Sequence, residues 1–188
     1  MGRWEPDARG RLEQAALELY VERGYENTTV SEIAERAGLT ERTFFRHFAD
    51  KREVLFSGSA ALTELLVNAT LGAPASASPM EAVSAALEAT GAVIQRRGAG
   101  AQQRQSVIAA NAELQERELI KMASWASALS DALRRRGVED PAATLTAETG
   151  VAVFRVAFAR WVGQPRKRDL PKLIRESLDQ LRELAGGG

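Results

Sequence analysis

Four basic side chains gather in one short stretch of the chain. Arg42, Arg46, His47 and Lys51 fall within ten residues. A guanidinium can bind O6 and N7 of a guanine, while an ammonium or imidazolium can bind phosphate oxygens. Small polar or acidic residues accompany them: Thr29, Ser31, Thr40, Glu41 and Thr43. These residue types predict contact with double-stranded DNA, provided that one helix presents them together.

The elements that must position these side chains are two short helices joined by a glycine turn. Thr29-Val30-Ser31-Glu32 has the form of a capping box, which opens a helix. Gly38 makes the turn, and Thr40 caps the next helix, which carries the basic residues. An earlier helix, expected over about 7–23, ends at Gly24. This order is that of a DNA-binding helix-turn-helix.

The rest of the chain is also predicted to be helical, because no segment shows a strand period. Further helices are expected over about 50–70, 79–97, 102–136 (one or two), 141–162 and 169–185. The sequence therefore predicts an all-α protein of about nine helices. The Pro-, Ala- and Ser-rich stretch 72–79 has the composition of a loop and favours two domains. These are an N-terminal helix-turn-helix domain of three helices over 1–56 and a C-terminal helical domain over 57–188.

Composition restricts the classes of protein to consider. Residues 1–56 hold nine Lys or Arg and eleven Asp or Glu, a net charge of −2, so DNA affinity depends on where the charges lie. One histidine, no cysteine and no P-loop or Gly-x-Ser-x-Gly motif argue against an enzyme, a metal site or a disulfide, and we expect no cofactor. With no apolar leader and no run long enough to span a bilayer, we expect a cytoplasmic protein without a membrane partner.

Residues 7–56 resemble the tetracycline-repressor (TetR) family of transcriptional regulators. The resemblance lies in the order and spacing of several short motifs. They are Arg-Gly-Tyr at 23–25, Thr-Thr-Val-x-x-Ile-Ala at 28–34, Ala-Gly-Leu-Thr at 37–40, an aromatic pair before Arg-His-Phe at 44–48, and Asp50-Lys51. A match over about fifty residues is more specific than a helix-turn-helix pattern alone, because it includes the flanking helices.

The resemblance implies that some of these residues bind the DNA backbone. Thr29, with the N–H groups at the same helix start, takes a phosphate position, as do His47 and Lys51. Ser31 lies where some members reach a base edge, although a serine is short for that contact. Thr40 is the cap of the reading helix. The alternative for His47 is a residue that only packs or caps.

The first turn of the reading helix is expected to read bases. Arg42 is the main candidate, with Thr43 beside it for a thymine methyl and Glu41 for a cytosine amine or to support Arg42. Arg46 is a further backbone or groove contact; the alternative is that both arginines form a solvated face. Phe45 departs from the family, which commonly has a tyrosine whose hydroxyl binds phosphate. Its ring is left to pack against a sugar or a thymine methyl.

One reading helix covers few base pairs, so two are needed about one helical turn apart. We therefore expect a homodimer on a palindromic operator, and the resemblance implies that the last two helices form its interface. Two apolar stripes support this expectation: Leu170, Leu173, Ile174, Leu178 and Leu181 in one helix, and Val151, Phe154, Phe158, Trp161 and Val162 in the other. Burial of both stripes in the core of one chain is the alternative.

Family members usually hold a small effector in the C-terminal domain, and here it is expected to be hydrophobic or aromatic. The candidate lining is apolar: Met122, Trp125, Ala126, Leu129, Phe154, Phe158 and Trp161. The alternative is that these residues are plain core. The function predicted is a repressor that its effector releases from DNA. The other function considered is a helical ligand-binding or protein-interaction module that has lost specific DNA binding.

Overall fold

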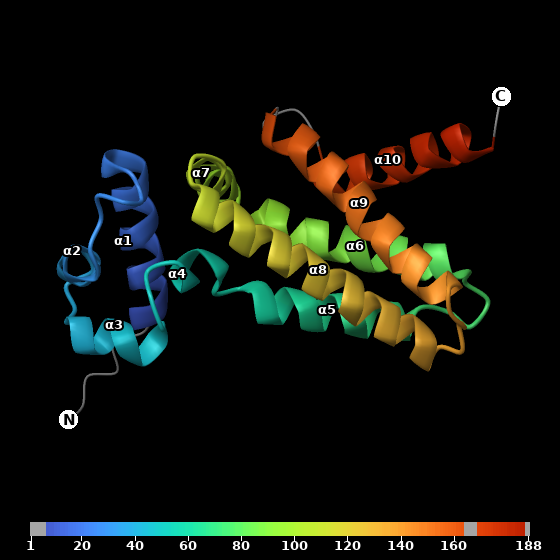
Figure 1. Cartoon of the computed structure of the whole chain (residues 1–188), viewed down its shortest axis with the longest axis horizontal. Coiled ribbons are helices and arrows are strands. Elements are labelled where there is room, and N and C mark those ends of the chain that lie inside the picture. Colours follow the sequence, from blue (N-terminus) through green and yellow to red (C-terminus); the bar gives the residue numbers. More distant parts are fainter. Residues whose placement is uncertain (1–6, 164–168, 187–188) are drawn as a thin grey trace. The chain divides into compact units, whose positions relative to one another are not determined.

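The computed structural model describes residues 7–163 and 169–186, and every regular element within them is a helix. The helices shown in Figure 1 are α1 (Ala8–Arg23), α2 (Val30–Arg36), α3 (Glu41–His47), α4 (Glu53–Phe56), α5 (Ser59–Gly72), α6 (Pro79–Arg96), α7 (Ala99–Ala109), α8 (Ala112–Arg135), α9 (Ala142–Gly163) and α10 (Leu170–Ala185). They number nine when α4 and α5 are taken as one interrupted helix. The prediction of an all-α protein is confirmed.

The chain divides into two compact units. The N-terminal unit contains the described residues up to Ser59 together with Gln102–Glu116, and the C-terminal unit contains Ala60–Ala101 together with the described residues from Arg117 onwards. Most of α7 and the start of α8 therefore pack with helices that lie far from them in the sequence. Three of their side chains are buried in the core of the N-terminal unit: Val107, Ile108 and Leu114.

Helix α1 has a capped N-terminus and one stripe of buried side chains. The carboxylate of Asp7 accepts the Gly10 N–H at 2.8 Å. Gly24 ends the helix with a φ of 86°, in the region that favours glycine. The buried side chains recur at helical spacing, as the sequence predicts: Leu12, Ala15, Ala16, Leu19 and Tyr20.

Helices α2 and α3 begin at the predicted caps. Thr29 and Glu32 form both halves of the capping box. Thr40 Oγ1 accepts the Thr43 N–H at 3.2 Å. Gly38 makes the turn between the helices with a φ of 67°. Figure 1 shows both helices beside α1, which they contact.

The helix predicted over about 50–70 is interrupted. Ser57 and Gly58 lie between α4 and α5, outside both helices. Glycine is a poor helix former, and the Ser57 hydroxyl donates to the Glu13 carboxylate at 2.7 Å. The side-chain contact with α1 therefore accompanies a break that the hydrophobic pattern did not predict.

In the C-terminal unit, α6, α9 and α10 pack against one another. The approach of α6 to α9 depends on a residue without a side chain, since a methyl group at Gly150 would lie 2.5 Å from Val83 Cγ1. Helices α5 and α8 complete the same hydrophobic core through residues such as Leu66 and Leu129, both fully buried.

Two helical stretches are long and apolar enough to cross a membrane by length and composition alone. They are Glu53–Gly72 and Ala142–Gly163. Core helices of soluble proteins meet the same criterion of length and composition. Because α9 supplies buried side chains such as Val151 and Phe154 to the core, core packing accounts for its apolar character.

Candidate nucleic-acid interface

Ion pairs neutralise much of the acidic surface that the N-terminal unit carries. Arg36 pairs with Glu22 at 2.9 Å, and Arg23 pairs with Glu32 at 2.9 Å. The hydrogen bond from Arg36 lowers the pKa of the Glu22 carboxyl. The hydrogen bonds from Thr29 lower the pKa of the Glu32 carboxyl. These carboxylates are therefore ionised at neutral pH and are matched by arginines of α1 and α2.

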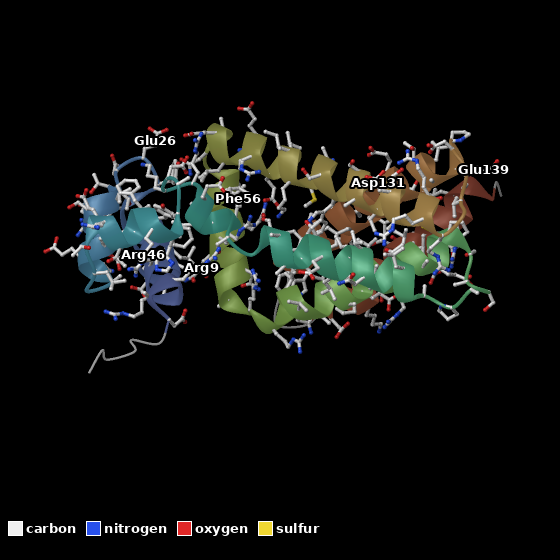
Figure 2. The ribbon with its side chains drawn as sticks, turned by 90° about the horizontal axis from the view of Figure 1, so that it is seen from below. Arg9, Glu26, Arg46, Phe56, Asp131 and Glu139 are labelled. Atoms are coloured by element: carbon white, nitrogen blue, oxygen red, sulfur yellow. The ribbon has the colours of Figure 1, made fainter. Side chains whose placement is uncertain are left out.

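Arg42 and Arg46 are different, because both are exposed on α3 without a partner. Neither arginine makes a hydrogen bond or an ion pair with any residue that the structure describes. Arg46 is labelled in Figure 2. Every other described arginine of this unit has a carboxylate or carbonyl partner: Arg9, Arg11, Arg23, Arg36, Arg52 and Arg104. Helix α3 thus presents two uncompensated guanidinium groups, the arrangement that binding to DNA requires.

The opposite face of α3 fixes the helix on its scaffold. Phe44 is fully buried and Phe48 nearly so, and their ring centroids lie 5.5 Å apart. Phe45 lies on the outer side with 55% of its surface exposed. Its ring edge packs against Phe44 at a centroid distance of 5.5 Å and an interplanar angle of 82°. The inward pair therefore holds a helix whose outward face remains free.

The small polar residues are mostly used within the fold. The N–H and the hydroxyl of Thr29 both donate to Glu32 Oε2 at 2.9 Å, so neither donor is free for a phosphate in this arrangement. The hydroxyls of Thr40 and Thr43 lie 3.1 Å apart and hydrogen-bond to each other. Ser31 is exposed at the start of α2. The predicted DNA contacts of these residues remain predictions.

Glu41 is exposed and makes no hydrogen bond or ion pair with Arg42 among the described residues. The suggested support of the guanidinium by this carboxylate is therefore absent from this structure. Base reading by Glu41 stays a prediction.

Lys51 is held by the protein rather than presented to solvent. Its ammonium donates to the carbonyls of Tyr25, Glu26 and Thr28 at 2.9, 3.4 and 3.0 Å, and lies 4.4 Å from the centre of the Tyr25 ring. In return, the Tyr20 hydroxyl donates to the Lys51 carbonyl at 2.7 Å. With three acceptors for its three N–H groups, Lys51 ties the loop before α2 to the segment after α3, and the phosphate contact that the resemblance implied stays a prediction.

His47 is only half-exposed, at the end of α3. Its Nε2 is buried and has no hydrogen-bond partner among the described residues. The Nε2 atom is therefore not presented to a phosphate in this conformation, and a phosphate contact by His47 stays a prediction.

The predicted effector-lining residues lie together in the C-terminal unit. Met122, Trp125, Leu129, Phe154 and Trp161 are buried, and Phe158 is partly buried. The rings form a row in which neighbouring centroids are 5.1 Å apart for Trp125 and Phe154, 5.7 Å for Phe154 and Phe158, and 5.8 Å for Phe158 and Trp161. Both indole N–H groups are buried without a described partner. These residues form core packing here, and a role in ligand binding remains a prediction.

The two apolar stripes of the last helices serve mainly the core of one chain. Leu170, Leu173, Ile174 and Leu178 are buried within the chain, because α10 packs on both α6 and α9. The exposed residues of α9 include, beside the charged Glu148 and Arg155, a stripe of small and apolar residues at helical spacing: Leu145, Ala152, Val156 and Ala159. This stripe was not predicted from the sequence, because alanine is common on both buried and exposed faces of a helix.

Two family models match the chain in succession. Residues 13–57 match the model for bacterial regulatory proteins of the tetR family, and residues 77–185 match the model for the MftR C-terminal domain. The second match alone spans more than half of the chain. The chain belongs to the TetR family of regulators. This is a family of DNA-binding transcriptional regulators rather than of enzymes.

Two TetR relatives differ in how much of the chain they match. TcmR of Streptomyces glaucescens is 45% identical over 78 residues, which are 42% of this chain and 34% of TcmR. The chain therefore covers only about a third of that relative in the match. The MftR transcriptional regulator of Mycobacterium tuberculosis is 24% identical over 191 residues, covering 100% of this chain and 94% of MftR.

Solved structures of TetR-type regulators share the fold. The complex of SmeT with triclosan matches with a TM-score of 0.69 at 19% identity, over 94% of this chain and 90% of that one. FadR from Bacillus subtilis in complex with stearoyl-CoA matches with a TM-score of 0.64 at 20% identity, over 92% of this chain and 96% of that one. An N-terminal helix-turn-helix and a C-terminal helical domain are thus the architecture of this chain.

Proposed function

We propose that this TetR regulator is a cytoplasmic homodimeric repressor that binds a palindromic operator and is released by a small hydrophobic or aromatic effector. The observation that carries the DNA-binding part is the pair of partnerless arginines on α3, Arg42 and Arg46. In a unit whose other described arginines are all paired, they form a local positive face on an acidic domain. The rest of the proposed DNA-binding surface comes from seven neighbouring residues of the helix-turn-helix: Thr29, Ser31, Thr40, Glu41, Thr43, Phe45 and His47.

Lys51 takes a different part in this proposal. Its ammonium sets the position of the loop before α2 through the Tyr25, Glu26 and Thr28 carbonyls. A direct phosphate bond would require the ammonium to leave one of these carbonyls. We therefore propose that Lys51 positions the helix-turn-helix. Replacing Lys51 separates this positioning role from direct binding of a phosphate.

The proposed dimer uses the exposed apolar stripe of α9 and the end of α10. Leu145, Val156 and Leu184 expose 62%, 54% and 82% of their surface, so these two helices, which pack together, leave large aliphatic groups uncovered. A second copy related by a twofold axis would cover the stripe with the same stripe. Sedimentation tests this: Val156→Glu should give monomers, whereas Leu119→Glu, at a similarly exposed apolar position on α8, should leave the dimer intact.

The effector proposal rests on the aromatic row of the C-terminal unit. Two structural neighbours were solved with ligands that have a large apolar part, SmeT with triclosan and FadR with stearoyl-CoA. The row from Trp125 to Trp161 is the densest group of aromatic side chains in the described C-terminal unit, and it suits a ligand of that kind. Quenching of tryptophan fluorescence by triclosan or a long-chain acyl-CoA, absent in Trp125→Phe, would support this site.

Selection of bound duplexes from random DNA tests the DNA-binding function. We expect enrichment of an inverted repeat whose half-sites are about one helical turn apart and contain a guanine read by Arg42. Recovery of no sequence above background would overturn the repressor. Ligand-induced fluorescence changes without DNA selection would favour the second candidate, a module that has lost DNA binding. The observation that supports this second function is Phe45, which lacks the tyrosine hydroxyl that commonly binds phosphate in the family.

A further inference from the structure

Phe45 is the one aromatic residue with an exposed side chain in the described part of the molecule. The other described aromatic side chains are buried or partly buried, whereas 55% of Phe45 is exposed. The ring is not loose, because its edge rests against Phe44, which is fully buried. A large apolar surface is therefore held in a fixed place on the outside of α3.

Phe45 also lies on the same face of the helix as the two free arginines. At about 100° per residue, Arg42, Phe45 and Arg46 occupy an arc of roughly 100° on α3. Phe44 lies on the far side of the helix and faces the core. A duplex that receives the two guanidinium groups from this face therefore also meets the Phe45 ring.

The chemistry of the ring limits what it can recognise. Phenylalanine has no hydroxyl, so it cannot bind a phosphate by hydrogen bonding. In the major groove, the apolar group that distinguishes one base from the others is the 5-methyl of thymine. We propose that Phe45 is a specificity-determining residue that reads a thymine methyl in each half-site. The inference rests on the proposed DNA-binding function and adds a base to its operator.

The geometry also places that thymine. Phe45 is three residues beyond Arg42, an advance of about 4.5 Å along the helix axis, compared with about 3.4 Å between successive base pairs. The thymine is therefore expected within about two base pairs of the guanine bound by Arg42. Loss of one methyl contact should weaken binding about fourfold for each half-site.

Replacement of thymine by uracil tests the contact directly, because it deletes the methyl and leaves every hydrogen-bonding group of the base unchanged. Each thymine of the selected operator is replaced in turn in both half-sites, and the Kd of the full-length protein is measured by fluorescence anisotropy at one salt concentration. We expect one symmetric pair of positions at which uracil weakens wild-type binding about 16-fold. Phe45→Ala should bind the two duplexes equally, whereas Phe45→Tyr, which keeps the ring, should retain the preference for thymine.

Three results would overturn the inference. One is an operator with no thymine near the guanine, and another is wild-type binding that is indifferent to uracil at every position. The third is a Phe45→Ala variant that binds more weakly but keeps the full uracil effect, which would assign the ring to a sugar. In all three, specific DNA binding persists, so the proposed function survives; failure to select any sequence would overturn both.

Discussion

The hydroxyl of Tyr20 donates a hydrogen bond of 2.7 Å to the backbone carbonyl of Lys51, 31 residues further along the chain. The Lys51 ammonium donates to the carbonyls of the loop that follows α1. The two residues thus fasten α1, the loop before α2 and the segment after α3 to one another. Because both ends of the helix-turn-helix are held at this point, its shape depends on Lys51 even if this side chain never touches DNA.

Replacing Lys51 by methionine should therefore lower stability. The change removes hydrogen bonds from a charged donor to two part-buried carbonyls and one exposed carbonyl, which should reduce the free energy of unfolding by about 2 kcal/mol. Urea unfolding followed by circular dichroism measures the loss. Arg46→Met is the matched control, since an exposed arginine without a partner should be replaced at little cost. Equal stability of the two variants would contradict the positioning role.

Replacing Arg42 or Arg46 by alanine should affect DNA binding and leave folding unchanged. Arg42→Ala should lose about 1 to 3 kcal/mol of discrimination at one base pair of each half-site. Arg46→Ala should weaken all duplexes alike and make the dependence of log K on log salt shallower by about one per subunit. Anisotropy titrations at several salt concentrations separate the two effects. If Arg46→Ala lost discrimination between base pairs and Arg42→Ala did not, Arg46 would be the base-reading residue and Arg42 the backbone contact.

Alkaline pH should unfold the N-terminal unit. Burial raises the pKa of Tyr25 to about 12, and burial also raises the pKa of Tyr20. Below about pH 10 both tyrosines are protonated in the folded and the unfolded chain, and stability is complete. As the pH rises from about 10 towards the folded pKa, the unfolded chain releases these protons first and stability falls. Urea midpoints should drop less steeply in Tyr25→Phe; identical slopes would contradict this assignment.

A methyl group at Gly150 should destabilise the C-terminal unit. It would lie 2.5 Å from Val83 Cγ1, on a branched side chain with little freedom to move. Overpacking of this kind costs about 1 to 3 kcal/mol, and the better helix propensity of alanine offsets only part of it. Gly72→Ala is the control, because nothing lies within 4 Å of its added methyl. A higher melting temperature in Gly150→Ala would show that α6 and α9 are less closely packed.

The helix-turn-helix was predictable because its signals are local. A threonine with a glutamate three residues later, a glycine turn and a second threonine cap act within one turn of helix, and all appear in the structure. The inward placement of Phe44 and Phe48 followed from their spacing. Local sequence was sufficient wherever a short-range hydrogen bond or helix periodicity determines the geometry.

Other features depend on contacts between residues far apart in the chain. The burial of Val107 and Ile108 in the N-terminal unit has no local signal, because an apolar helix face does not specify its partner. The break at Ser57 accompanies a bond to Glu13, 44 residues earlier. The hydrogen bonds from Lys51 to carbonyls of the loop before α2 could not be predicted either. Backbone acceptors cannot be recognised from side-chain types.

The affinity of the full-length protein for its selected operator, measured against a shuffled duplex of the same composition, tests the central claim most directly. With two free arginines on α3, the wild type should bind the operator about 1,000-fold more tightly than the shuffled duplex at physiological salt, or more tightly still. A folded Arg42→Ala, Arg46→Ala double variant should lose most of that preference. Equal affinity of the wild type for both duplexes, or an undiminished preference in the double variant, would contradict the assignment of α3 as the DNA-reading helix.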